Sequence, residues 1–263
     1  MVMTGGNRNS IPGWADLTYS CEPGQVSGIP FSRYSGEFWT SGQRKGSSLH
    51  EISYRACFKP QLPAFFIRHL TCKRDLVYDP FNGRGTTAIE AGLRGRAVAA
   101  NDINPLSILL TRPRLMPPDT NEVKARLDEI PYDGDEGAEI DISMFFHPDT
   151  EAEIVSLRRY LHERAHEGTL DYVDEWIRMV ATNRLTGHSP GFFSVYTLPP
   201  NQAVSPTRQI LINRKRNQLP EYRDTKALIL RKTCSLLKDV DNAIRDCLHH
   251  AGEHALLFSR DSR

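Results

Sequence analysis

Residues 76–87 read LVYDPFNGRGTT, and this stretch decides the fold. The compact apolar run Leu76–Tyr78 is typical of a buried strand. Gly83 and Gly85 then allow a tight turn that a ligand can approach closely. Residues 86–93 continue with the pattern of a helix, whose first free N–H groups favour an electronegative guest. The stretch therefore predicts a strand, a ligand-binding turn and a helix in succession.

A second apolar run over residues 97–100 ends at Asn101-Asp102. Strand, glycine turn, helix and strand in this order are the opening of a doubly wound parallel sheet. Asp102 follows Asp79 by 23 residues, which is about where an acidic side chain holds a nucleoside ribose by its hydroxyl groups. The third glycine of the dinucleotide fingerprint is missing, and so is the Gly-Lys-Ser/Thr end of a Walker A loop. A dinucleotide is therefore disfavoured as the ligand.

The chain has 263 residues, of which 39% are hydrophobic and 25% are charged, as in an ordinary globular protein. Apolar patterns predict a helix over 63–70, a long helical stretch over 225–251 and another buried strand over 255–258. We expect an α/β doubly wound domain from 46–118 plus 225–263. An irregular N-terminal arm over 1–45 and a largely helical insertion over 119–224 complete the predicted organisation.

Charge is segregated along the chain although the net charge is only +1. Residues 119–153 hold twelve acidic and two basic side chains, whereas residues 205–232 hold eight basic and two acidic ones. The basic segment suggests an anionic partner on one face of the molecule. The five cysteines form no CxxC pair, and neither a signal peptide nor a long apolar span is present, so a reduced, cytoplasmic protein without a membrane partner is expected.

The turn after the first strand resembles that of S-adenosylmethionine-dependent DNA amino-methyltransferases, which make N4-methylcytosine or N6-methyladenine. In that family a D-P-F-x-G-x-G-T-T turn holds the methionine end of the cofactor. The resemblance is dense over residues 48–107 and implies a Rossmann-like methyltransferase sheet. The positions that match the turn are Asp79, Pro80, Phe81, Gly83, Gly85, Thr86 and Thr87.

Three further segments are similar to cofactor elements of the family. Residues 101–106 resemble the second element, in which Asp102 would take the ribose beside Ile103 and Asn104. Residues 258–263 resemble the third, in which Asp261 would contact the adenine amino group, although a solvated charge cluster is the alternative reading. Residues 49–60 resemble the H-x(3)-Y-x-A-x-F-x-P segment that closes over the cofactor, with Tyr54, Ala56 and Phe58 at its fixed positions. Arg55, at a variable position between them, is expected to contact the cofactor with these three.

The catalytic tetrapeptide of the family does not occur in this sequence. That tetrapeptide is Ser, Asp or Asn followed by Pro-Pro and an aromatic residue, and it holds the target amino group and stacks the extruded base. The two Pro-Pro pairs, at 117–118 and 199–200, lack this context. The resemblance thus implies a split subunit or a truncation with no catalytic residue in this chain. We expect a second methyltransferase subunit that carries the motif and adds strands beside 255–258.

The basic segment is the predicted contact with double-stranded DNA. Aromatic residues precede it at Phe192, Phe193 and Tyr196, and basic loops with aromatic neighbours suit phosphate neutralisation and base stacking. A solvated helix face is the alternative. The residues expected to contact phosphates are Arg208, Arg214, Lys215 and Arg216.

Two histidine patterns suggest metal sites, and both are interpreted as ordinary helix surface. Residues 162–166 match H-E-x-x-H, which places two imidazoles on one helix face, but no third ligand is evident. The group Cys247, His249, His250 and His254 fits no standard ligand spacing. No metal is therefore expected.

These patterns and the resemblance lead to one functional expectation. The chain would be the cofactor-binding subunit of a site-specific DNA methyltransferase, in which an exocyclic amine attacks the methyl group of S-adenosylmethionine in line. Cytosine-N4 is preferred over adenine-N6, and a restriction-modification system is the expected setting. The alternative is a non-catalytic nucleic-acid-binding protein that keeps a relic cofactor pocket.

Overall fold

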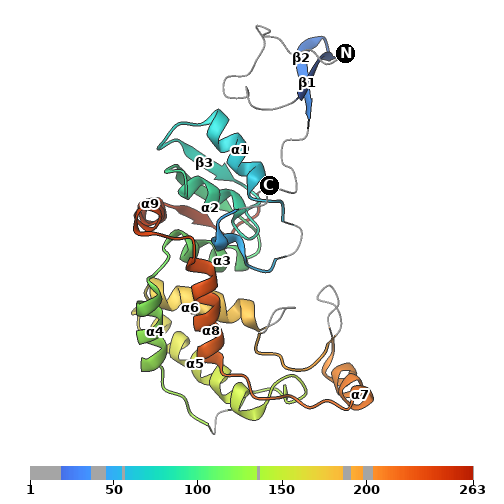
Figure 1. Ribbon diagram of the computed structural model, residues 1–263, viewed down its shortest axis with the longest axis vertical. Helices are drawn as coiled ribbons and strands as arrows, with labels where there is room; N and C mark the ends of the chain where they lie inside the picture. The colour runs from blue at the N-terminus through green and yellow to red at the C-terminus, as the bar shows by residue number, and fades with distance from the viewer. Residues whose placement is uncertain are drawn as a thin grey trace.

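The structure is a computed structural model that describes residues 19–36, 46–54, 57–134, 137–185, 191–197 and 204–262. Figure 1 shows three parts along its long axis: a two-stranded hairpin, a part that contains a three-stranded sheet, and a helical part. Within the described residues, no helix is long and apolar enough to cross a lipid bilayer.

The N-terminal arm contains a hairpin, whereas the sequence predicted an irregular segment there. Strands β1 (Tyr19–Val26) and β2 (Ile29–Gly36) pair in antiparallel fashion. Ser27 and Gly28 between them have φ values of 49° and 82°, as a two-residue turn matched to the strand twist requires. The Ser-Gly pair between these segments is a turn signal that the interpretation of this arm missed.

The predicted parallel sheet is present. Strands β3 (Leu76–Asp79), β4 (Ala97–Asn101) and β5 (Leu256–Phe258) run parallel in the order β3-β4-β5. Val77 lies opposite Val98, and Ala100 lies opposite Leu257. This adjacency confirms the α/β class and the strand pairing expected from the sequence.

Only the middle strand of the sheet is buried, so the prediction of three buried strands was wrong for the outer two. Val98 in β4 is fully buried, whereas 59% of Leu76 in β3 and 52% of Leu256 in β5 is exposed. An outer strand has a neighbour on one side only, and neither apolar run contains the information that it lies at an edge.

Five short elements surround the sheet: the 3₁₀ turn η2 (Ser48–His50), α1 (Gln61–Leu70), α2 (Thr86–Gly92), α3 (Leu106–Leu115) and α9 (Asn242–Glu253). Helix α2 contacts β3 and β4, and α9 contacts α2, α3 and β4. Ile89, Leu115 and Leu248 are fully buried where these helices meet. The packed helices thus fix the start of α2, which the glycine turn directly precedes.

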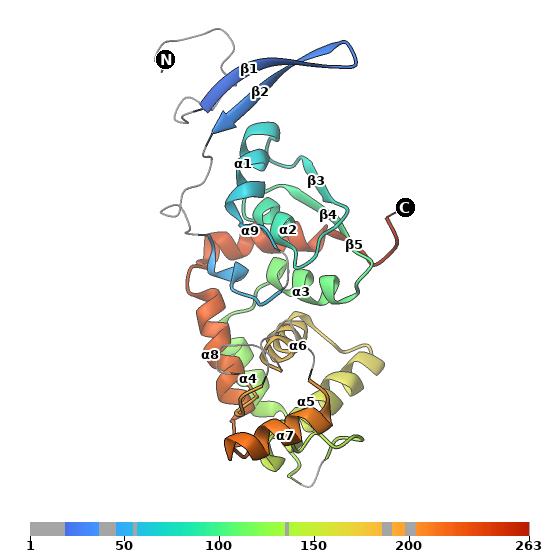
Figure 2. The same cartoon turned by 90° about the vertical axis from the view of Figure 1, so that its right-hand side faces the viewer.

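The helical part consists of α4 (Thr120–Glu129), α5 (Pro148–His166), α6 (Tyr172–Arg184) and α8 (Thr225–Leu237), with α7 (Pro206–Arg216) at its outer end (Figures 1 and 2). The carboxylate of Asp174 is fully buried and pairs with Arg126 and with Arg164, whose Nε lies 2.6 Å from Asp174 Oδ2. Trp176 donates from its indole nitrogen to Thr233 Oγ1 at 3.0 Å. These contacts join α4, α5, α6 and α8 into one unit.

The stretch 225–251 forms two helices where the sequence predicted one. Helix α8 ends at Leu237, and Asp241 accepts a hydrogen bond from the N–H of Ile244 to begin α9. Helix α8 contacts α4 and α6, whereas α9 contacts the sheet. Helix α8 also contacts η2 beside the sheet, so the predicted boundary at residue 225 stays a prediction, and the apolar face of α8 does not by itself specify which surface it covers.

Candidate functional site

Three carboxylates follow the three strands of the sheet at the same edge. Asp79 ends β3, Asp102 follows β4 and Asp261 follows β5. The N–H of Asp102 donates to Phe258 O at 3.2 Å, which extends the pairing of β4 with β5 to this edge. In open α/β sheets, ligands bind outside the carboxyl ends of the strands. This edge is therefore the candidate site.

The glycine turn has a backbone that only glycine adopts readily. Gly83 and Gly85 have φ values of 54° and 83°, in the left-handed region that costs a residue with a Cβ about 1–2 kcal/mol. A Cβ on Gly85 would overlap Thr111 Oγ1, and a Cβ on Gly83 would lie 3.4 Å from the ring of Tyr54. The turn thus lies against Thr111 on one side and against Tyr54 on the other.

Asp102 connects the glycine turn to the loop after β4. Its Oδ2 accepts from the N–H of Gly83 at 2.7 Å, and its Oδ1 accepts from the N–H of Asn104 at 2.9 Å. Each carboxylate oxygen has a further lone pair. The side chain can therefore hold both loops in place and still accept hydrogen bonds from two hydroxyl groups.

Asn101 brings the segment after β5 to the same place. Its Nδ2 donates to Arg260 O at 3.0 Å and to Ser262 Oγ at 2.8 Å, and its Oδ1 accepts from the N–H of Arg260. Ser262 Oγ in turn donates to Pro80 O at 2.9 Å. These bonds place the exposed residue Asp261 beside the turn after β3. The sequence reasoning missed this role of Asn101, although Asn101 stands next to Asp102 in a quoted motif.

Asn82 connects the turn to helix α3. It is buried, and its Nδ2 donates to Ser107 Oγ and to Thr111 Oγ1, both at 2.8 Å. Its backbone N–H donates to Asn101 O at 3.0 Å. The side chain at this variable position of the motif thus fixes the turn on α3, a function that the sequence reasoning did not assign.

Two arginines tie the upstream segment to the turn. Arg84 Nη1 donates to the carbonyl groups of His50 and Ile52 at 3.1 and 3.0 Å. Arg114 is fully buried, donates to Leu49 O at 3.1 Å, and also contacts Arg84 O. Burial lowers the pKa of Arg114 to about 9, with a further contribution from the charge of Arg84. Arg114 therefore stays charged at neutral pH and keeps η2 next to the turn.

A buried pair, His50 of η2 and Glu90 of α2, adds a pH-dependent contact between these two elements. Their side chains meet at 2.7 Å, and burial lowers the pKa of His50 below 6.5 although Glu90 acts in the opposite direction. The unfolded chain therefore takes up this proton at a higher pH than the folded chain. Stability should fall as pH drops below about 6.5, with a slope of at most about 1.4 kcal/mol per pH unit.

The replacement His50→Gln should flatten this part of the pH dependence in urea unfolding measured from pH 7.5 downward. His162→Gln is the control because His162 is exposed on α5, and it should leave the slope of the parent chain intact. A slope that survives His50→Gln would assign the acid sensitivity to other groups.

The remaining predicted cofactor residues differ in their placement. Phe58, Phe81 and Ile103 are exposed by 44%, 76% and 69%, so their apolar side chains lie at the surface around the turn. Thr86 is buried and accepts from Arg84 Nε at 3.2 Å, while Thr87 faces α1 and β3. Arg55 and Ala56 lie outside the described residues.

The predicted DNA contacts lie on helix α7, away from the strand ends (Figure 1). Arg208, Arg214 and Lys215 are exposed, and the guanidinium of Arg216 stacks 3.6 Å from the centre of the Tyr196 ring. A stacked aromatic and cationic pair beside exposed basic side chains can neutralise phosphates and contact a base.

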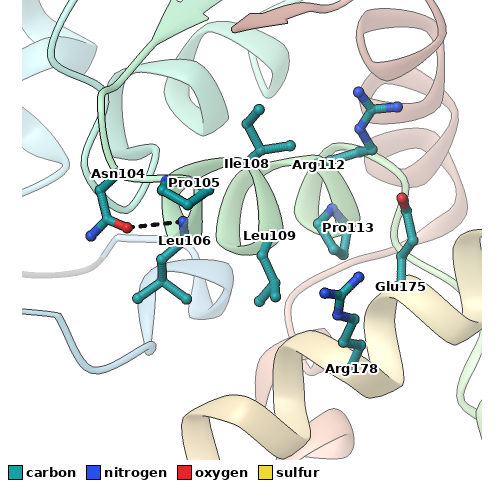
Figure 3. A pocket seen from close by; sticks show the side chains of 9 residues that line it. All are labelled: Asn104, Pro105, Leu106, Ile108, Leu109, Arg112, Pro113, Glu175 and Arg178. Atoms are coloured by element: carbon teal, nitrogen blue, oxygen red, sulfur yellow. Dashed lines mark hydrogen bonds between the residues drawn. The ribbon is translucent and has the colours of Figure 1, made fainter. Parts of the chain in front are cut away.

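A separate pocket of about 470 Å³ lies between α3 and α6 (Figure 3). Arg112, Glu175 and Arg178 line it, and burial raises the pKa of Glu175. Asn104 also borders this pocket, where its Oδ1 accepts from the N–H of Leu106 at 3.0 Å. None of the three strand-end carboxylates lines the pocket, but Asn104, whose N–H donates to Asp102 Oδ1, connects it to the loop after β4.

The two histidine patterns have different geometries. His162 and His166 are exposed on α5, whereas His249 Nε2 lies 3.0 Å from Pro117 O and Cys247 Sγ donates to Gly92 O. Within the part of the chain that the structure describes, His250, Glu253 and His254 are the group whose ligand atoms approach within 4.8 Å of one another. All three are exposed side chains at the end of α9.

Comparison with known proteins gives a similarity to DNA methylases over the part of the chain that carries the glycine turn. Residues 22–109 match the model of a family described as DNA methylase. Over 82 residues the chain is 30% identical to the Type II methyltransferase M.MvaI of Kocuria varians. That similarity covers 30% of this chain and 18% of the relative, so the chain spans less than a fifth of the length of the curated relative it matches. No solved structure matches the chain.

Proposed function

We propose that the chain binds S-adenosylmethionine at the carboxyl ends of β3, β4 and β5 and forms the cofactor-binding part of a DNA amino-methyltransferase. One observation carries the proposal. Asp102 bonds to the N–H of Gly83 while Asn101 and Ser262 connect the segment after β5 to Pro80, so that the segments after all three strands meet at one glycine turn. Carboxylates accept hydrogen bonds, so this site suits a nucleoside whose hydroxyl, amino and ammonium groups donate them.

The residues present suit this cofactor. The tight turn at Gly83 and Gly85 would hold the methionine end, next to the ring of Tyr54. Asp102, whose two oxygens each keep a further lone pair, would accept from the ribose hydroxyl groups. Asp261 would accept from the adenine amino group.

S-adenosylmethionine, when bound, supplies an electrophilic methyl group. The residues of this chain would contribute orientation and a locally dry surface, because positioning the reacting atoms accounts for much of the catalytic effect in a direct transfer. Phe58 and Phe81 are exposed aromatic side chains near the turn that could cover such a site. Arg84 and Arg114 would act as positioning residues, since they hold the segment that carries Tyr54 and Phe58 against the turn.

The proposed substrate is double-stranded DNA, methylated at an exocyclic amine of a base. Cytosine-N4 is preferred over adenine-N6, and a restriction-modification system is the proposed setting. The match to the DNA methylase family supports DNA as the substrate, while the preferred base rests on the resemblance alone. We further propose that a second polypeptide supplies the Pro-Pro-aromatic tetrapeptide that holds the target amine.

Calorimetric titration of the purified chain with S-adenosylmethionine tests the proposal. Saturable binding with one site per chain is expected. Absence of binding would favour the non-catalytic nucleic-acid-binding alternative, in which the turn and its carboxylates are a relic.

The basic end of α7 should account for part of the DNA affinity. Joint replacement of Arg214, Lys215 and Arg216 by alanine should lower the slope of log affinity against log salt by about 0.9 for each phosphate that these side chains neutralise in the parent chain. Fluorescence anisotropy with a duplex at several salt concentrations measures this slope.

A triple variant with alanine at Lys73, Lys124 and Arg158 removes the same charge from exposed positions elsewhere. It should change the slope less than the α7 variant. Equal effects of the two variants would mean that net charge, and not α7, determines the affinity.

A further inference from the structure

We propose that His250, Glu253 and His254, at the carboxyl end of α9, bind one zinc ion on the surface of this chain. Helix α9 leads into the amino end of β5 (Figure 2), whereas the strand-end carboxylates lie at the carboxyl ends of the strands. The metal site is therefore at the opposite end of β5 from the candidate cofactor site. Its test does not depend on the proposed function.

The spacing of the three residues places their side chains on one face of the helix end. Residues three and four apart on an α-helix are neighbours, and His250, Glu253 and His254 stand at positions i, i+3 and i+4. One ligand atom from each side chain lies within 4.8 Å of the others. In a tetrahedral zinc site with bonds of about 2.1 Å, the ligand atoms are about 3.4 Å apart. The exposed side chains need to approach by at most about 1.4 Å, which is within the reach of side-chain rotation.

The ligand atoms of this group are available to an ion. All three side chains are exposed, and within the ranges that the structure describes their ligand atoms have no hydrogen bond or ion pair with the protein. Cys247 and His249, which the sequence pattern grouped with these histidines, are bonded elsewhere. Cys247 Sγ donates to Gly92 O, and His249 Nε2 lies 3.0 Å from Pro117 O. The structure thus leaves Cys247 and His249 out of the group and adds Glu253.

The types of ligand favour zinc. Two imidazole nitrogens and one carboxylate oxygen are typical zinc ligands, whereas Mg²⁺ and Ca²⁺ prefer oxygen ligands throughout. The last turn of a helix also carries the negative end of the helix dipole, which favours a cation. The fourth position of the ion would be open to water. An ion held in this way would connect the last turn of α9 to His254, and β5 begins shortly afterwards at Leu256.

A second set of the same residue types, on α5, shows what the spacing contributes. His162, Glu163 and His166 are also exposed. Glu163 directly follows His162, however, and adjacent positions on a helix do not face each other. Glu163 Oε1 instead lies 3.9 Å from Arg159 Nε. This part of α5 therefore offers two imidazoles on one face, whereas the end of α9 offers two imidazoles and a carboxylate.

Calorimetric titration of the purified, untagged chain with Zn²⁺ tests the proposal. We expect one zinc ion per chain, and no comparable binding when Mg²⁺ is the probe. His250→Gln and His254→Gln should each weaken zinc binding at least tenfold, because each variant removes one of three ligands. Zinc should also raise the urea midpoint of the parent chain, since it binds the folded state, and this shift should be lost in both variants. With Co²⁺ as the probe, the absorption spectrum should lack a thiolate charge-transfer band, because no cysteine is a ligand.

The double variant His162→Gln/His166→Gln is the matched control, since it removes two exposed histidines with the same spacing from α5. It should leave the zinc affinity within twofold of the parent chain. The proposal is overturned if the chain binds no zinc, if His250→Gln and His254→Gln bind zinc as tightly as the parent chain, or if the α5 variant loses as much affinity as they do. Zinc-dependent pairing of two chains in sedimentation would also overturn a site within one chain.

Discussion

Replacement of Asp102 by alanine should weaken S-adenosylmethionine binding by about 10- to 150-fold, since a hydrogen bond to a charged group contributes about 1.5–3 kcal/mol. The Asp102 side chain has one proposed role and one role that the structure shows. It is the proposed acceptor for the ribose, and it already accepts from the N–H groups of Gly83 and Asn104. The variant therefore loses its bond to the ligand and also the bonds that connect the two cofactor loops.

Calorimetry with the variants Asp102→Ala and Asp102→Asn separates these tasks. The asparagine side chain keeps one acceptor oxygen, so its loss of affinity should be smaller. Asp128→Ala is the control, because Asp128 is exposed on α4 in the helical part. If the dissociation constant of Asp102→Ala equals that of the parent chain, Asp102 only caps the end of β4 and the proposed ribose contact is wrong.

Gly85→Ala should destabilise the chain by about 2–5 kcal/mol, and Gly83→Ala by only about 1–2 kcal/mol. Both residues have positive φ values, so each variant bears the cost of the left-handed conformation. They differ in their surroundings. The added Cβ at position 85 would overlap Thr111, whereas at position 83 it meets only the Tyr54 ring at 3.4 Å.

Urea unfolding of both variants measures the difference. The double variant Gly85→Ala/Thr111→Ala removes the overlapping hydroxyl and methyl groups, so it should recover part of the loss relative to the cost of Thr111→Ala alone. Equal stability losses for the two glycine variants would show that α3 moves away from the turn and that the packing at Gly85 is not tight.

The fold around the site follows largely from local sequence. The apolar runs at 76–78 and 97–100 and the glycines between them predicted two adjacent parallel strands, and the structure confirms their pairing. Turn formation by Gly83 and Gly85 and the helix after them depend on backbone preferences of neighbouring residues. Such preferences can be recognised without knowledge of the rest of the molecule.

Elements whose environment is set by distant segments were not predictable in this way. The run at 76–78 is as apolar as a buried strand, yet Leu76 and Tyr78, in an outer strand of the described sheet, are largely exposed. Helix α8 has an apolar face that could cover either part of the molecule, and it packs on α4 and α6. Periodicity identifies an apolar face but does not specify its partner.

The amino-acid sequence by itself determined the α/β order of elements, the glycine turn and the acidic residues that end the strands. Only the tertiary structure decided that Asn101 holds Ser262, 161 residues further along the chain, and that the buried cation of Arg114 keeps residue 49 beside the turn. The physical reason is the range of the interactions. Backbone conformations and helix periodicity depend on near neighbours in sequence, whereas these hydrogen bonds exist only once the sheet and helices have packed and excluded water from them.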